Sequence, residues 1–356
     1  MDAILNDWSE QIRAAGAAGR KLRLRGGGSK DFYGNALAGE VVDTGPYAGI
    51  VAYEPTELVI TARCGTPMAE LEAALADKGQ CLAFEPPSFG AATLGGAVAA
   101  GLSGPRRAAV GSLRDFVLGV KIIDGDGRQL SFGGQVMKNV AGYDVSRLMA
   151  GSLGTLGLIA EVSLKVLPLP VAEATLRFEL PEERALEAMN RWAGQPLPIS
   201  ASCWQEDVLT LRLSGAAAAV GSARQALGGE SVPEAEAQAF WRGLREQTAD
   251  FFADADQGEP LWRVSLPSVA GHADLPGRQL IEWGGSQRWA RCGAEARQVR
   301  AMAEALGGTA TLFRGGDKSV GVFHPLAPAN LAIHRRLKQA FDPKGVFNPG
   351  RFYAEL

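Results

Sequence analysis

The chain reads R-L-R-G-G-G-S-K across residues 23–30, where arginine alternates with leucine before three glycines, a serine and a lysine. Consecutive glycines give up side-chain packing and cost backbone entropy on folding. Their backbone N–H groups can approach a phosphate closely and form an anion site. A plain hairpin turn is the alternative interpretation of these residues. Other segments of the chain have to decide between an anion site and a turn.

Two common phosphate loops do not fit this stretch. The P-loop requires G-x-x-x-x-G-K-[ST], whereas Ser29 precedes Lys30 and Asp31 follows it. The Rossmann fingerprint requires a glycine where Asp31 stands. The stretch G-L-S-G at 101–104 lacks the last glycine of a nucleophile elbow, so a Ser-His-Asp hydrolase is not indicated.

Length, composition and charge limit the kinds of protein that this chain can be. A chain of 356 residues favours more than one domain. Its 45 glycines are nearly twice the usual share of about 7%, and they cluster in short segments, which indicates loop geometry rather than disorder. A net charge of −3 does not favour a nucleic-acid partner. Four isolated cysteines and three histidines predict no metal site.

The N-terminus is acidic and has no apolar region, so no signal peptide is expected. No run approaches the roughly 20 apolar residues of a membrane span. We therefore expect a cytoplasmic protein, or one that is peripheral to the inner membrane.

Periodicity predicts mixed helices and strands in the first half. Apolar residues recur at helical spacing in 3–15. Thr66-Pro67 is interpreted as the hydroxyl cap and first position of a helix that stops at Gly79. Strands are expected at 22–25, 40–43, 49–53 and 58–62, in a hairpin over 116–132, and at 158–166.

Composition shifts after Pro168 and Pro170. The order strand, helix, strand, strand, helix predicts the beginning of a ferredoxin-like α+β domain, with elements at 173–179, 182–193, 198–204, 207–213 and 216–227. Near the end, 328–341 is predicted as an amphipathic helix whose Arg335, Arg336 and Lys338 face solvent.

Three further glycine-rich segments favour a ligand over a plain turn. They are P-P-S-F-G-A-A-T-L-G-G-A-V-A-A-G-L-S-G at 86–104, V-G-S-L-R-D-F-V at 110–117 and K-N-V-A-G-Y-D-V-S-R-L-M-A-G-S-L-G-T-L-G-L-I at 138–159. Close helix packing is the alternative for 86–104. With F-N-P-G-R-F-Y at 347–353, the series resembles the FAD-binding fold of the vanillyl-alcohol oxidase (PCMH) type. Within it, the chain resembles the FAD-binding subunits of bacterial glycolate oxidases, the glycolate dehydrogenase complexes.

The resemblance implies an α+β protein in three parts: a two-subdomain PCMH-type FAD-binding domain (1–170), a ferredoxin-like cap or docking domain (171–320), and a C-terminal segment (321–356) that packs back on the FAD domain. It implies that main-chain amides from Arg25 to Lys30 wrap the FAD pyrophosphate, whose charge suits these two cations. The implied cofactor residues are Arg25, Gly26, Gly27, Gly28, Ser29 and Lys30 in the loop; Pro87, Thr93, Gly95, Gly96, Ala100, Gly101 and Gly104 along the flavin and ribityl chain; Gly111 and Asp115 at the adenosine; Gly157, Leu158 and Ile159 as backbone contacts; and Asn348 near the isoalloxazine.

The resemblance also bears on how FAD is held and on catalysis. Members that bind FAD covalently use a histidine or cysteine in or near these loops, whereas 25–30 has neither and the first histidine is His272, so non-covalent FAD is expected. A hydroxy acid needs a cation for its carboxylate and a base for its hydroxyl. Related catalytic subunits carry an H-x-G-D-G-N-x-H type segment, where this chain offers Arg314 and a lone His324. These two are candidates, with a structural role as the alternative.

The implied function is that of an FAD-dependent oxidoreductase subunit that oxidises glycolate, a small 2-hydroxy acid, to glyoxylate. The implied partners are a second FAD-binding catalytic subunit and an iron–sulfur subunit, because this chain has no cysteine motif to carry electrons onward. Two alternatives stay open: a self-sufficient dehydrogenase or oxidase for another hydroxy acid, and a non-catalytic assembly subunit that keeps FAD as a structural element.

Overall fold

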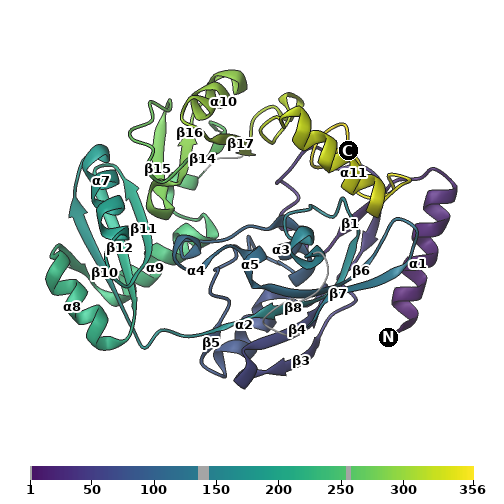
Figure 1. Ribbon diagram of the computed structural model, residues 1–356, viewed down its shortest axis with the longest axis horizontal. Helices are drawn as coiled ribbons and strands as arrows, with labels where there is room; N and C mark the ends of the chain where they lie inside the picture. The colour runs from purple at the N-terminus through teal and green to yellow at the C-terminus, as the bar shows by residue number, and fades with distance from the viewer. Residues whose placement is uncertain (1, 135–143, 254–257) are drawn as a thin grey trace. The chain divides into compact units, whose positions relative to one another are not determined.

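The chain folds into two units that interleave along the sequence (Figure 1). The computed structural model describes residues 2–134, 144–253 and 258–356. The first unit comprises Met1–Leu102, Ser112–Pro168 and Pro325–Leu356, and the second comprises Ser103–Gly111 and Leu169–His324. Of the motif K-N-V-A-G-Y-D, only Asp144 lies within the described residues.

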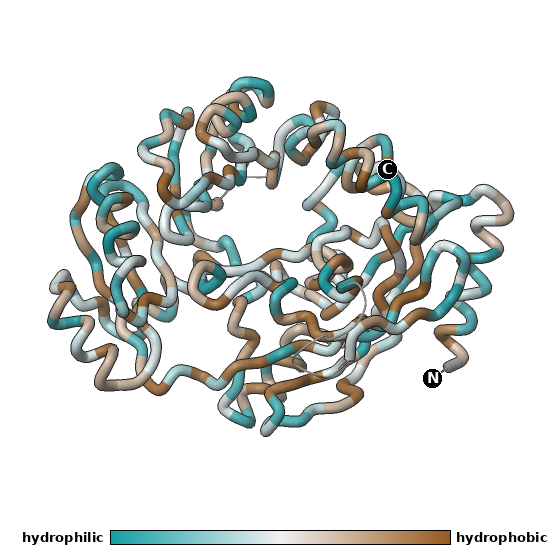
Figure 2. Tube along the Cα trace, in the orientation of Figure 1, coloured by the Kyte–Doolittle hydropathy of each residue, from teal (hydrophilic) through white to brown (hydrophobic). Residues whose placement is uncertain are grey.

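The first unit contains a five-stranded antiparallel sheet in the order β3-β4-β8-β6-β7. Its strands are β3 (Ile50–Glu54), β4 (Val59–Arg63), β6 (Val117–Ile123), β7 (Gln129–Gly133) and β8 (Leu158–Lys165). Hydrophobic residues run along these strands in Figure 2. The predicted strands and the hairpin are confirmed, with shifts of one residue at their ends. In β8 the polar face is also covered, because Ser163 shares a hydrogen bond of 2.8 Å with Thr61 on β4.

Helices and two small two-stranded sheets complete this unit. One sheet pairs β1 (Leu22–Arg25) with β2 (Glu40–Asp43) in parallel, and the other pairs β5 (Gln80–Cys81) with β9 (Leu167–Pro168). The helices are α1 (Asp2–Ala17), α2 (Met68–Ala76), α3 (Leu94–Ala100), α5 (Leu113–Phe116), α6 (Val145–Met149) and α11 (Pro328–Phe341). The helical spacing of Leu5, Trp8 and Ile12 buries one face of α1 in a core that includes Val346 and Phe347. The C-terminal segment therefore packs in the same core as α1, beside β1.

The second unit is built on an eight-stranded antiparallel sheet in the order β13-β10-β12-β11-β15-β16-β14-β17. The half with β10 (Ala172–Glu179), β11 (Ile199–Gln205), β12 (Val208–Gly215) and β13 (Glu230–Val232) has the strand order of a ferredoxin-like fold. Helices α7 (Glu182–Ala193) and α8 (Ala217–Leu227) bury apolar faces in its cores. The prediction for this half is confirmed.

The second half of the sheet lies in a stretch for which the sequence predicts little. It contains β14 (Leu261–Ser265), β15 (Arg278–Glu282), β16 (Gln287–Arg291) and β17 (Thr309–Arg314), with α9 (Glu234–Glu246) before them and α10 (Ala296–Ala305) packed on them. The excursion Ser103–Gly111, which carries α4 (Arg107–Val110), joins this unit. There the indole N–H of Trp283 donates to the Gly104 carbonyl (3.1 Å), and the Arg107 guanidinium lies 4.4 Å from the Trp283 ring.

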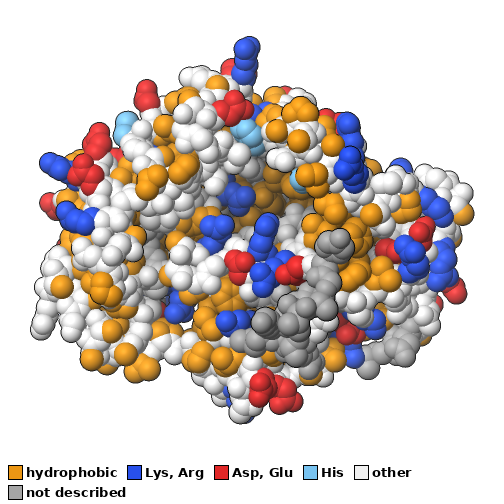
Figure 3. Space-filling view, viewed as in Figure 1, with side chains coloured by type: hydrophobic (Ala, Val, Ile, Leu, Met, Phe, Trp, Pro, Cys, Tyr) orange, Lys and Arg blue, Asp and Glu red, His pale blue; other side chains and the backbone are white. Residues whose placement is uncertain are grey.

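Two local predictions are wrong. Thr66 does not cap α2: its buried hydroxyl exchanges hydrogen bonds with the backbone of Gly49, at 2.9 and 3.2 Å. Lys338 does not face solvent, because its ammonium group forms a largely buried ion pair with Asp342. In both cases a distant segment provides backbone or charged groups that local patterning cannot reveal. On the face shown in Figure 3, Lys and Arg side chains are interspersed with Asp and Glu, in line with the small net charge.

Candidate functional site

The three glycines follow β1 and cross the segment 91–93 at backbone distance. A Cβ on Gly27 would lie 1.6 Å from the carbonyl oxygen of Ala91, and a Cβ on Gly26 would lie 2.2 Å from Oγ1 of Thr93. Gly28 has a φ of +73°, in the left-handed region that favours glycine. The strand that pairs with β1 is parallel to it, so the hairpin interpretation is wrong. The glycines are required by the close approach of two chain segments.

The second glycine-rich segment forms α3. Oγ1 of Thr93 caps this helix by accepting a hydrogen bond of 3.4 Å from the N–H of Gly96. A Cβ on Gly95 would lie 2.7 Å from Cβ of Cys64, and one on Gly101 would lie 2.8 Å from the backbone of Gly151. Close helix packing is therefore real here. The same small residues also leave open space on the side of α3 that faces the glycine loop.

A small, partly open cleft lies between these elements, and all of its lining residues belong to the first unit. Its walls come from the end of β1, α3, residues 153–159 and the C-terminal turn. The lining residues are Leu24, Arg25, Gly26, Thr44, Cys64, Gly95, Gly96, Ala99, Leu153, Gly154, Gly157, Leu158, Ile159 and Asn348. Most of the wall is main chain or small apolar side chain, as expected for a site that holds an extended ligand through backbone groups.

The cleft brings together eight of the residues implied by the sequence: Arg25, Gly26, Gly95, Gly96, Gly157, Leu158, Ile159 and Asn348. Nine others belong to the same unit but do not line the cleft: Gly27, Gly28, Ser29, Lys30, Pro87, Thr93, Ala100, Gly101 and Asp115. Gly104 and Gly111 belong to the second unit. Sequence reasoning missed Leu24, Thr44, Cys64, Ala99, Leu153 and Gly154. The G-S-L-G motif could have indicated Leu153 and Gly154, whereas no local signal marks Thr44 or Cys64.

Positive charge gathers around the loop that enters the cleft. The guanidinium groups of Arg23 and Arg25 share Oδ2 of Asp31, at 2.5 and 3.0 Å. The Lys30 ammonium lies 3.3 Å from the carbonyl oxygen of Ser88. Asp31 thus pairs with two arginines, and these cations with Lys30 make the loop suited to an anionic ligand.

Asp115, which the resemblance implies at the adenosine, forms a capping box with Ser112. Its Oδ2 accepts hydrogen bonds of 2.8 Å from both the backbone N–H and the hydroxyl of Ser112. Burial raises the pKa of this carboxyl, but the hydrogen bonds and nearby arginines outweigh that effect and lower its pKa below the ordinary value. The carboxylate is therefore ionised at neutral pH, and it caps the N-terminus of α5.

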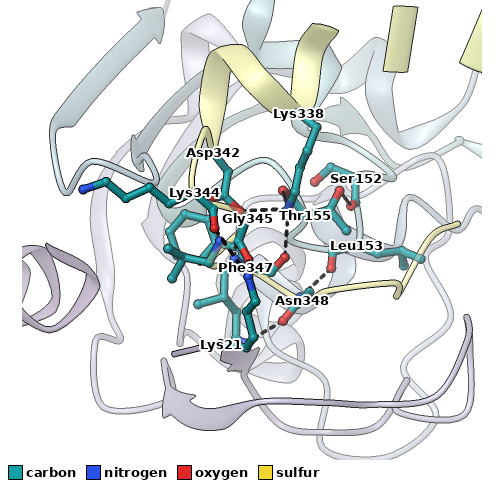
Figure 4. A network of polar contacts seen from close by, with 12 residues as sticks. Lys21, Ser152, Leu153, Thr155, Lys338, Asp342, Lys344, Gly345, Phe347 and Asn348 are labelled. Atoms are coloured by element: carbon teal, nitrogen blue, oxygen red, sulfur yellow. Dashed lines mark hydrogen bonds and ion pairs between the residues drawn. The ribbon is translucent and has the colours of Figure 1, made fainter. Parts of the chain in front are cut away.

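Asn348 joins two walls of the cleft. Its side-chain oxygen accepts a hydrogen bond of 2.9 Å from the N–H of Leu24, and its side-chain nitrogen donates one of 2.6 Å to the carbonyl of Leu153 (Figure 4). Its backbone N–H also donates to the Leu22 carbonyl (2.9 Å). The amide is therefore engaged in holding β1 against the loop 151–157.

A buried ion pair holds the segment before Asn348 in place (Figure 4). The Lys338 ammonium donates to Oδ2 of Asp342 (2.8 Å) and to the carbonyls of Thr155 (2.8 Å) and Phe347 (3.0 Å). Asp342 in turn accepts from the backbone N–H groups of Val346 and Phe347. Burial lowers the pKa of Lys338, and the Asp342 charge opposes that effect. The pair connects the end of α11 to the cleft loop at Thr155.

Cys64 is the thiol that lines the cleft. Its Sγ lies 3.8 Å from the Thr44 carbonyl oxygen, and burial raises its pKa to about 12. A thiol with that pKa is protonated at neutral pH and is a poor nucleophile. The presence of a cysteine in the cleft therefore does not by itself provide a covalent flavin link.

The two catalytic candidates lie in the second unit and have structural contacts there. Nδ1 of His324 accepts the N–H of Ala310 (3.3 Å), and its Nε2 lies 3.1 Å from Oε1 of Glu304. Arg314 donates to Oε1 of Gln247 (3.2 Å). These contacts support the structural alternative for both residues.

Two kinds of feature are absent from the described ranges. Within residues 2–134, 144–253 and 258–356, no three metal-ligating side chains of His, Cys, Asp or Glu lie together. In the same ranges, none of the helices combines the length and the apolar character needed to cross a membrane.

The cleft suits part of an elongated cofactor that carries a pyrophosphate. Five of its lining residues are glycines, so main chain lines the cleft without side chains at Gly26, Gly95, Gly96, Gly154 and Gly157. Arginine and lysine at the loop complement a diphosphate, and the apolar residues 158–159 offer contact to uncharged groups. The residues present therefore fit a dinucleotide such as FAD.

Comparisons with known proteins agree with this geometry. Residues 5–133 match the FAD binding domain family, and residues 230–352 match the C-terminal domain of FAD linked oxidases. The chain is 51% identical over 348 residues to glycolate oxidase subunit GlcE of Escherichia coli (strain K12), covering 98% of this chain and 97% of that protein. It is 25% identical to a D-lactate dehydrogenase of Archaeoglobus fulgidus, covering 94% and 86%, and 33% identical over 127 residues to glycolate oxidase subunit GlcD of Bacillus subtilis (strain 168), covering 36% and 27%.

A solved structure shows the same fold at low identity. An alkyldihydroxyacetonephosphate synthase superposes with a TM-score of 0.67 and 16% sequence identity, covering 96% of this chain and 74% of that one. This likeness concerns the architecture alone.

Proposed function

Since the chain belongs to the family of FAD-linked oxidases that includes glycolate oxidase subunit GlcE, we propose that it is the FAD-binding subunit of a glycolate oxidase complex. The observation that carries this proposal is the cleft in the first unit, where eight residues implied by the motifs meet. The reaction is the two-electron oxidation of glycolate to glyoxylate.

Residues of this chain hold the cofactor and control its surroundings. Arg25 and Gly26, which line the cleft, would bind the pyrophosphate together with the neighbouring backbone N–H groups of Gly27–Ser29 and the charge of Lys30. Gly95, Gly96 and Gly157 would leave room for the rest of the cofactor, and the apolar residues 158–159 would contact its uncharged groups. When bound, FAD supplies the acceptor for hydride from the hydroxyl-bearing carbon. We propose that the binding is non-covalent, because residues 25–30 contain neither histidine nor cysteine and the Cys64 thiol in the cleft is buried.

The electrons leave through other chains in this proposal. The partners are a second FAD-binding catalytic subunit and an iron–sulfur subunit, and any association with a membrane runs through them. The name of the Escherichia coli relative, a subunit, supports a complex. The structural contacts of His324 and Arg314 favour this function over independent turnover.

Anaerobic spectroscopy of the purified full chain tests the proposal. We expect the chain alone to retain flavin and to show no rapid bleaching of the flavin band with glycolate, and bleaching to appear when the partner chains are added. Rapid bleaching of the isolated chain would instead identify a self-sufficient dehydrogenase. Full activity of a complex whose flavin site in this chain has been emptied would identify an assembly subunit, and a chain that binds no flavin would refute all three.

A further inference from the structure

Arg351 is a buried cation that does not line the cleft. Only 6% of its surface is exposed. Its guanidinium donates to the carbonyl oxygens of Lys30 (3.4 Å) and Asp31 (2.9 Å), and also to those of Tyr33 and Asn35. One side chain from the C-terminal turn thus collects four carbonyl groups from the segment that follows the glycine loop.

The segment 30–35 holds the C-terminal turn in return. The backbone N–H of Asn35 donates to the Arg351 carbonyl (3.0 Å), and its side-chain nitrogen donates to the Gly350 carbonyl (2.9 Å). A Cβ on Gly34, whose φ is +99°, would lie 3.0 Å from the Arg351 carbonyl oxygen. The two segments are separated by more than 300 residues in sequence and pack here at backbone distance.

The buried charge makes this arrangement depend on loop conformation. Burial lowers the pKa of Arg351 to about 10, while the charge of Asp31 raises it and that of Arg23 lowers it further. The guanidinium is therefore charged at neutral pH. A buried cation is costly unless polar atoms replace its water, and here carbonyl oxygens of 30–35 do so. If that segment changes conformation, the cation loses its acceptors.

A short series of contacts leads from Arg351 to the cleft. Arg351 holds the backbone carbonyl of Asp31. The carboxylate of Asp31 holds the guanidinium groups of Arg23 and Arg25, and Arg25 lines the cleft. A shift of the Asp31 backbone therefore moves a charged group at the binding surface.

We propose that Arg351 is a positioning residue for FAD binding: through the carbonyl groups of residues 30–35 it keeps the glycine-rich loop in its binding form. Docking of the C-terminal turn and binding of the cofactor are then thermodynamically coupled, so each strengthens the other by the same factor. This inference rests on the proposed function, because it requires FAD to bind in the cleft. It adds a residue that acts on the cofactor through the loop and does not touch the cofactor.

Titration of the full-length apoprotein with FAD tests this role. The variants are Arg351→Met, which removes the donors, and Arg351→Lys, which keeps a charge and a smaller set of donors. The matched control is Arg335→Met, an exposed arginine on α11. The dissociation constant is measured well below the unfolding temperature, and hydrogen exchange of residues 30–35 and 349–356 is followed with and without FAD.

We expect Arg351→Met to weaken FAD binding by about tenfold or more, the scale expected when a binding group is displaced by a fraction of an ångström. Arg351→Lys should fall between wild type and Arg351→Met, and Arg335→Met should stay within about twofold of wild type. In the wild type, FAD should slow exchange in both segments. Should Arg351→Met fail to fold, the lysine variant and the wild-type exchange experiment still decide the matter.

Three results would overturn the inference: a folded Arg351→Met variant that binds FAD as wild type does, a lysine variant no better than the methionine variant, or FAD that leaves exchange at 349–356 unchanged. Wild-type protein that does not bind FAD at all would refute the proposed function itself. The two failures are therefore distinguishable.

Discussion

Replacing Gly27 by alanine tests whether the glycine loop has to touch the segment before α3. The added Cβ would lie 1.6 Å from the carbonyl oxygen of Ala91 and 2.8 Å from its carbonyl carbon. Real Cβ atoms essentially never approach another heavy atom closer than 3.0 Å. Because the obstacle is backbone and not a flexible side chain, the loop and the segment at 91 have to separate.

The required movement sets the size of the effect. Raising the contact from 1.6 Å to 3.0 Å displaces one backbone against the other by about 1.4 Å. A misplacement of about 1 Å can lower the rate of an enzyme reaction about 100-fold, and we take the same scale for cofactor binding. We therefore expect the dissociation constant for FAD to rise by about two orders of magnitude, or about 2.7 kcal/mol.

The assay is calorimetric titration of FAD into the apoprotein, with circular dichroism to verify the fold. Gly221→Ala is the matched control, since Gly221 lies within α8 of the second unit and nothing stands within 4 Å of its Cβ position. It should bind FAD as wild type does and gain up to about 1 kcal/mol of stability from helix propensity. A Gly27→Ala variant that binds FAD within about threefold of wild type would show that the close approach is not needed.

Three further outcomes are expected. Asp342→Asn leaves the Lys338 ammonium buried beside a neutral group, and chemical denaturation should show a loss of about 3–5 kcal/mol; a loss below about 1 kcal/mol would mean that the pair is not a stabilising contact. Burial, aided by the hydrogen bond to Glu161 (2.6 Å), raises the pKa of Tyr47 from its ordinary value of 10.0 to about 12. The native state therefore keeps a proton that the unfolded chain releases between these values, and stability should fall as pH rises through that window, by up to about 2.7 kcal/mol. Tyr47→Phe lacks this titration, so wild type should lose stability relative to it between pH 10 and 12 in pH-dependent unfolding, and parallel curves would contradict the assignment. Finally, acid precipitation should release all flavin into the supernatant, equally for wild type and Cys64→Ser, and flavin retained on the wild-type chain alone would show a thioether link at Cys64.

The cleft shows how much of a binding site sequence motifs can predict. The glycine motifs predict that several main-chain segments surround an extended ligand, and eight of the implied residues do meet in one cleft. Thr44 and Cys64, the residues directly after β2 and β4, join them through the tertiary fold, and nothing in their own sequence neighbourhoods marks them. Local patterns identify which segments are small enough to approach a ligand. They do not identify the ordinary residues that those segments meet.

The environment of charged side chains near the C-terminus could not be predicted from the sequence. Helical periodicity correctly places α11 at Pro328–Phe341 but assigns Lys338 to the solvated side. Its true environment depends on Thr155, Asp342 and Phe347, of which Thr155 is 183 positions away. Arg351 is similar, since its acceptors lie near residue 30. A long cationic side chain looks the same in sequence whether it ends in water or among carbonyl groups.

The sequence by itself therefore determined the elements and the kind of ligand, because helix and strand periodicity, turn residues and glycine clusters act over a few neighbouring positions. The tertiary structure decided how the two ends of the chain cooperate. Residues 22–35 and 346–351 form one hydrogen-bonded unit only after the chain has folded back on itself. The buried cations Lys338 and Arg351 are stable there because folded backbone carbonyls, and in the case of Lys338 a carboxylate, replace the water that each cation loses.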